Sequence, residues 1–100
     1  MDDARLLLRG EVIAELADAR PDMSWFEVRF VGTPGFSEVE SLFREERALL
    51  DSPDFDSDAW QSVWERIWEN GVTLELDDGT RVERDFAVHV YDDGTARFRY

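Results

Sequence analysis

Apolar residues at every second position predict that this chain begins with β-strands. Residues 5–17 carry their apolar side chains on even positions, and residues 25–31 continue the same alternation. Successive side chains of a strand point to opposite faces of a sheet, so a period of two gathers the apolar residues on one face. The two strands are predicted to form a hairpin turning near residues 20–22. Gly10 is predicted to be a bulge or bend that lets the first strand curl.

Helical spacing replaces strand alternation in the middle of the chain. Ser37 followed by Glu40 is the pattern of a capping box, which predicts a helix over residues 38–50. A second helix is predicted to begin near a cap at Asp58 and to end at Asn70-Gly71, because glycine readily adopts the left-handed conformation that terminates helices.

The remaining residues contain Asp-Asp-Gly-Thr twice, at 77–80 and 92–95. Asp-Asp-Gly suits a three-residue hairpin loop, in which a type I turn is followed by glycine in the left-handed region. Such a loop pairs Val88 with Phe98 and keeps apolar side chains on one face. The pattern predicts a three-stranded meander, with Arg84 at a bulge or strand end because it falls on the apolar side.

Together these elements predict one α+β domain over residues 1–100. The expected architecture is a curved antiparallel sheet of about five strands, in the order ββααβββ, with two helices packed on its apolar face. A chain of 100 residues is the size of a single domain and can bury a substantial core.

Three tryptophans lie four residues apart on the second predicted helix. Trp60, Trp64 and Trp68 form one stripe with Val63 and Ile67. If all three indoles were exposed, they would make an apolar patch of about 600 Å², which is at the upper limit for a typical monomer. The stripe is therefore predicted to face the core, with Trp68 at its edge. The alternative is a partner-binding surface.

The charge of the chain restricts its partners. The formal net charge is -13, from 24 acidic and 11 basic residues, and every basic residue is arginine. So negative a surface repels phosphate groups, and direct binding to nucleic acid is not expected. Mimicry of nucleic acid by rows of carboxylates is a further alternative, although the acidic residues gather at turns and helix starts.

The sequence offers few groups for catalysis or metal binding. It has no cysteine and a single histidine, His89, and no catalytic motif. The acids of residues 54–58 are similar to a calcium loop of the EF-hand type, but Ala59 stands where that loop requires glycine. No metal or cofactor is predicted, and a non-enzymatic role is favoured.

The expected location is the cytoplasm. The sequence shows neither a basic leader followed by an apolar stretch nor 18 consecutive apolar residues, so export and membrane insertion are not predicted.

The C-terminal run DFAVHVYDDGTARFRY and the arginine-only, acid-rich composition resemble small uncharacterised proteins of high-GC Gram-positive bacteria. The likeness covers mainly the last third of the chain. It implies no activity, cofactor or functional residue.

Candidate binding residues are aromatic or basic side chains that the alternation places outside the core. Trp25 and His89 fall on the solvated face of the predicted sheet, and Trp68 borders its helical stripe. The full set is Trp25, Trp68, His89, Tyr91, Arg97 and Arg99.

The predicted function is a non-enzymatic binding or regulatory module. It would act through a protein partner, as an inhibitor or immunity-type protein does, or through self-association. The alternative is a small-ligand-binding protein or small enzyme with a pocket between sheet and helices.

Overall fold

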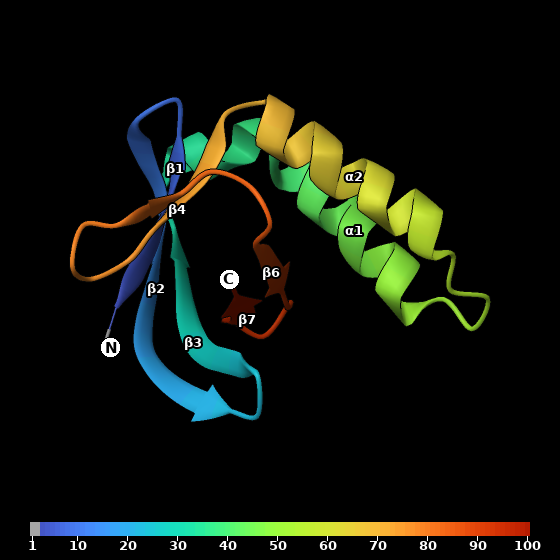
Figure 1. Ribbon diagram of the computed structural model, residues 1–100, viewed down its shortest axis with the longest axis horizontal. Coiled ribbons are helices and arrows are strands. Elements are labelled where there is room, and N and C mark those ends of the chain that lie inside the picture. The colour runs from blue at the N-terminus through green and yellow to red at the C-terminus, as the bar shows by residue number, and fades with distance from the viewer. Residues whose placement is uncertain (1–2) are drawn as a thin grey trace.

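The computed structural model describes residues 3–100 as a curled antiparallel sheet with a helical hairpin beside it (Figure 1). The predicted α+β class is confirmed, but the sheet has seven strands rather than about five. In chain order the elements are β1 (Ala4–Leu8), β2 (Glu11–Asp22), β3 (Trp25–Gly32), the 3₁₀ helix η1 (Pro34–Glu38), α1 (Glu40–Asp51), α2 (Ser57–Glu69), β4 (Val72–Glu75), β5 (Arg81–Val82), β6 (Ala87–Val90) and β7 (Thr95–Arg99).

The two C-terminal hairpins lie at opposite edges of the sheet, whose strand order is β5-β4-β1-β2-β3-β7-β6. The predicted three-stranded meander is therefore wrong. Residues 83–86 leave the sheet and carry the chain from one edge to the other, and Asp85 in this segment has a φ of 62°, outside the region of regular β-structure. Arg84 lies in this crossing segment and not within a strand.

Residues 5–17 form two strands where one was predicted. Arg9 and Gly10 have φ angles of 50° and 89°, and positive values at both central residues characterise the two-residue turn of a tight hairpin. Leu6 of β1 pairs with Ala14 of β2, so even positions still share a face after the chain reverses. The alternation alone therefore could not reveal this turn.

The two Asp-Asp-Gly-Thr turns adopt the predicted three-residue loops. Gly79 and Gly94 have φ angles of 87° and 84°, and Val88 pairs with Phe98 as expected. The backbone N–H of Tyr91 donates to the carbonyl oxygen of Thr95 at 3.0 Å, which closes the β6–β7 loop.

Gly94→Ala is expected to lower the free energy of unfolding by about 1–2 kcal/mol, the cost of a left-handed backbone for a residue with a Cβ. No atom lies within 4 Å of the added Cβ, so the backbone conformation accounts for the whole effect. Urea denaturation measures it. Gly94→Asn is the control, because asparagine tolerates this conformation and should lose less. An alanine variant as stable as wild type would contradict the assignment.

Both helices begin differently from the prediction. The capping box is absent: Ser37 lies inside η1, where its Oγ donates to the carbonyl oxygen of Pro34 at 2.9 Å, and α1 starts at Glu40. The carboxylate of Asp56, rather than that of Asp58, caps α2 by accepting from two backbone N–H groups at 3.0 and 3.2 Å. Pro34 starts η1 ahead of α1, and the Asp56 cap sets the start of α2.

The helical hairpin packs near both edges of the sheet, since α1 contacts β6 and α2 contacts β4. Trp64 is only 1% exposed and lies in the core, which confirms that the tryptophan stripe faces inward. Trp60 and Trp68 are half-buried and pack against the same core. Among the helices of residues 3–100, none has the length and apolar character required to cross a membrane.

Candidate functional site

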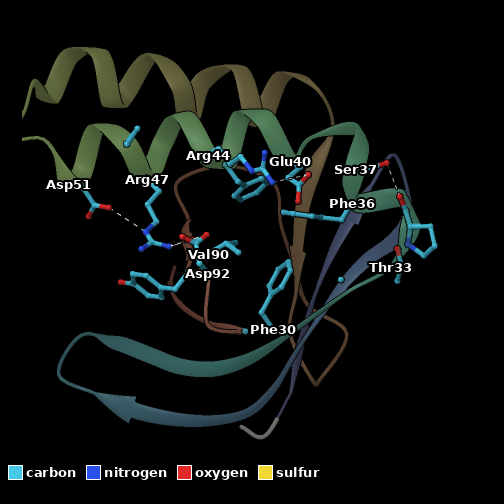
Figure 2. A pocket seen from close by; sticks show the side chains of 16 residues that line it. Phe30, Thr33, Phe36, Ser37, Glu40, Arg44, Arg47, Asp51, Val90 and Asp92 are labelled. Atoms are coloured by element: carbon cyan, nitrogen blue, oxygen red, sulfur yellow. Dashed lines mark hydrogen bonds and ion pairs between the residues drawn. The ribbon is translucent and has the colours of Figure 1, made fainter.

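A groove of about 800 Å³ lies between α1 and the sheet, and it is open to solvent (Figure 2). Aromatic side chains from four elements line it: Phe30 from β3, Phe36 from η1, Phe43 from α1 and Tyr91 from the β6–β7 turn. The Phe36 ring centre is 5.0 Å from that of Phe30 and 5.4 Å from that of Phe43. These contacts hold the rings in place, so the groove has a preformed apolar floor.

Charged side chains of α1 and of the β6–β7 turn form the rim of the groove. Arg44 pairs with Glu40 at 3.6 Å, and Arg47 pairs with Asp51 at 3.4 Å and with Asp92 at 3.7 Å. We call Glu40, Asp51 and Asp92 the rim carboxylates. They outnumber the two rim arginines, so the mouth of the groove is negatively charged overall.

Arg47 lines the groove and reaches from α1 to Asp92 of the β6–β7 turn (Figure 2). Its Nη1 donates to the carbonyl oxygen of Val90 at 3.4 Å, and its guanidinium lies 4.8 Å from the ring centre of Tyr91. A second hollow of about 470 Å³ lies beyond and is lined by Arg47, Tyr91 and Asp92 as well. We call these three residues the Arg47 partition, because they separate the two hollows.

The β6–β7 turn carries fixed negative charge beside this partition. Thr95 donates to Oδ1 of Asp93 from its hydroxyl at 2.6 Å and from its backbone N–H at 3.0 Å. These hydrogen bonds lower the pKa of Asp93 below its usual range, because they stabilise the carboxylate form. The neighbouring Asp92 side chain is fully exposed.

A second polar cluster is buried beneath α1. Glu46 is 0% exposed, and its Oε2 accepts from Nε1 of Trp60 at 2.7 Å and from Nε1 of Trp64 at 3.4 Å. Nδ1 of His89 lies 2.7 Å from the same oxygen but out of line for a hydrogen bond, so the contact is an ion pair when the imidazole is protonated. One carboxylate oxygen thus joins both helices to β6.

The prediction that His89 is solvent-exposed is wrong, since the residue is only 7% exposed. The alternation assigned it correctly to the opposite face from Val88, but β6 is an edge strand packed beside α1, and Glu46 of that helix covers this face. The Trp25 ring covers the imidazole as well, at a centre-to-centre distance of 4.6 Å.

The predicted binding residues do not form one site. Trp25 is half-buried against the core instead of facing away from it, and Arg99 lies 4.9 Å above its ring. Arg97 is opposite His89 in the β6–β7 ladder and pairs with Asp22 and Glu27 at 3.0 and 3.7 Å. Tyr91 lines the groove, and it also lines the second hollow together with Arg97.

Trp68 is on α2, away from both the groove and the outer sheet face. Its ring packs near Trp64 and Phe86, at centre distances of 6.1 and 6.3 Å. The guanidinium of Arg84 lies 5.0 Å above the ring and donates to Glu65 at 2.7 Å, which lowers the pKa of Glu65. The exposed edge of Trp68 is therefore covered by an ion pair of its own chain.

The alternative prediction placed a pocket between the sheet and the helices, where the groove lies, but of its lining residues the sequence singled out only Tyr91 as a binding residue. Part of its rim nevertheless leaves a pattern in the sequence. Glu40, Arg44, Arg47 and Asp51 recur at i, i+4, i+7 and i+11, which places all four on one face of α1. Charges in that spacing are normally read as a solvated helix face. Only the fold brings Phe30 and the β6–β7 turn opposite them.

Comparisons with protein families, with curated proteins and with solved structures found no match to this chain. Within residues 3–100, no three acidic or histidine side chains are grouped so as to hold a metal ion. The proposed function therefore rests on the geometry of the groove and of the residues around it.

Proposed function

We propose that this protein is a non-enzymatic binding module that receives a segment of a partner protein in its groove. The open, aromatic-floored groove of about 800 Å³ carries this proposal. Protein interfaces commonly seat an apolar anchor in such a preformed pocket and surround it with a polar rim. Occupation of the groove would cover part of the partner surface, as inhibitor and immunity-type proteins do, and we place this activity in the cytoplasm.

The chemistry of the groove favours binding over catalysis. His89 does not line it, and Arg44 and Arg47 contact the rim carboxylates. Arginines are interspersed among the carboxylates on α1 and on the outer sheet face, which disfavours mimicry of nucleic acid.

A small amphipathic molecule is the second candidate occupant, and the size of the groove favours it. Pockets for small ligands commonly measure about 300–1,000 Å³. The peptide-binding experiment with Ala48→Trp distinguishes a protein segment from a small molecule as the occupant.

Ala48→Trp is expected to block the groove and weaken partner binding by at least about tenfold, since a lost anchor contact of about 1.4 kcal/mol has that effect. Ala48 is an exposed residue of α1 that lines the groove, so the added indole fills it without disturbing the core. A library of random twelve-residue peptides displayed on phage is selected on immobilised protein, and calorimetry gives the Kd of each enriched peptide.

Ser62→Trp is the matched control, because it adds the same indole to an exposed position of α2 outside the groove. Peptides that bind wild type and Ser62→Trp but not Ala48→Trp would support the proposal. Enrichment of no peptide, or equal binding to all three proteins, would contradict it. If instead only a dye such as anilinonaphthalene sulfonate binds, and Ala48→Trp abolishes that binding, the small-ligand function replaces it.

A further inference from the structure

We infer that the partner segment is basic as well as apolar, and that one of its arginine or lysine side chains replaces Arg47 beside Asp92 while an apolar side chain rests on Phe30 and Phe36. This inference rests on the proposed function of the groove. It specifies that the partner segment is cationic, and it identifies Arg47 as the side chain that moves when the segment binds.

The Arg47 partition is held by long contacts. Arg47 lies 3.4 Å from Asp51, 3.7 Å from Asp92 and 3.4 Å from the carbonyl oxygen of Val90. Well-formed hydrogen bonds between ionised groups measure about 2.7–2.9 Å, as the Arg84–Glu65 pair of this chain does at 2.7 Å. The Nε of Arg47 is also buried without a hydrogen-bond partner. Displacing this side chain therefore costs few good interactions.

Displacement of Arg47 would join two hollows that the partition now separates. The groove of about 800 Å³ and the hollow of about 470 Å³ share Arg47, Tyr91 and Asp92 as lining residues. An extended segment could then run past the β6–β7 turn from one hollow into the other. The Tyr91 ring, freed from Arg47, would offer its face to an incoming guanidinium.

The charge around the two hollows selects a cationic segment. The lining residues include five carboxylates and three arginines, and withdrawal of Arg47 leaves a larger negative excess. A second copy of the chain, at a net charge of -13, and nucleic acid are both repelled by this surface. The charged lining residues are Glu27, Glu40, Asp51, Asp92, Asp93, Arg44, Arg47 and Arg97.

Three synthetic peptides test the inference. The first has a tryptophan flanked by two arginines on each side, the second replaces the arginines with glutamates, and the third replaces the tryptophan with alanine. We expect the first to bind at least about tenfold more tightly than either of the others, and to weaken as salt is raised, because opposite charges attract at short range and salt screens them. Calorimetry at low and high salt measures the Kd values.

Variants of the protein locate the contact. Asp92→Asn should weaken the arginine peptide several-fold, whereas Asp77→Asn, which removes the same charge from the matching position of the β4–β5 turn, should not. Arg47→Gln should strengthen binding, because no side chain must then be displaced, provided that its circular dichroism matches wild type.

The outcomes separate this inference from the proposed function. If the arginine and glutamate peptides bind equally and Ala48→Trp blocks both, the groove binds a partner but the inference is overturned. Equal effects of Asp92→Asn and Asp77→Asn would overturn it too. If these peptides fail to bind while other displayed peptides are enriched, the inference alone is overturned, and if none is enriched both proposals are.

Discussion

Glu46→Ala is expected to lower the free energy of unfolding by about 3–5 kcal/mol, the cost of breaking a buried charged cluster by removing one partner. The indole N–H groups of Trp60 and Trp64 would lose their acceptor, and Nδ1 of His89 would lose the carboxylate oxygen that lies 2.7 Å away. Unpaired buried donors retain the full penalty of leaving water. Urea denaturation with linear extrapolation measures the change.

The adjacent residue is a matched control for Glu46. Glu45 is exposed and pairs with Arg66 at 2.7 Å, and an exposed pair contributes about 1 kcal/mol or less. Glu45→Ala should therefore change stability by no more than that amount. If the two alanine variants lost similar stability, the buried cluster would not be a principal support of the fold.

Trp64→Ala is the second substitution with a large expected effect, a loss of about 3–5 kcal/mol, as is usual when a buried aromatic side chain is truncated. Trp64 is 1% exposed, and its ring packs edge-on against Phe43 and Phe86 at 5.9 and 5.8 Å. Differential scanning calorimetry should show a correspondingly lower Tm.

Trp68→Ala is the comparison for Trp64→Ala within the same stripe. The half-buried indole of Trp68 has no hydrogen-bond partner at Nε1 among the described residues, so its removal should cost about 1–2 kcal/mol. The opposite ranking of the two variants would show that the edge of the stripe, rather than its centre, supports the core.

The sequence predicted local geometry well, because local geometry depends on neighbouring residues. The pairing of Val88 with Phe98 followed from a loop of three residues and from alternation on either side of it. The inward position of Trp64 followed from helical spacing and from the cost of exposing three indoles. Both predictions needed only contacts within one hairpin or one helix.

Strand order and the environment of each face could not be predicted in the same way. The alternation shows which face His89 occupies, but not that an edge strand lies beside α1, where Glu46 covers that face. The crossing at residues 83–86 separates two hairpins that look continuous in sequence. The groove combines Phe30, Arg47 and Tyr91 from three distant segments, so its lining cannot be derived from the pattern of any one segment.

The placement of β7 beside β3 has a consequence for the order in which the protein folds. The ladder between these strands joins Phe26 to Phe98, so the first half of the sheet depends on residues far along the chain from it. Until β7 pairs with it, β3 is an open edge with unpaired backbone groups, which can recruit strands from other chains. Contacts so far apart in sequence also form slowly. Closure of the sheet and the contact of Glu46 with His89 are thus expected to form after the local hairpins and the helices, because both join segments distant in sequence.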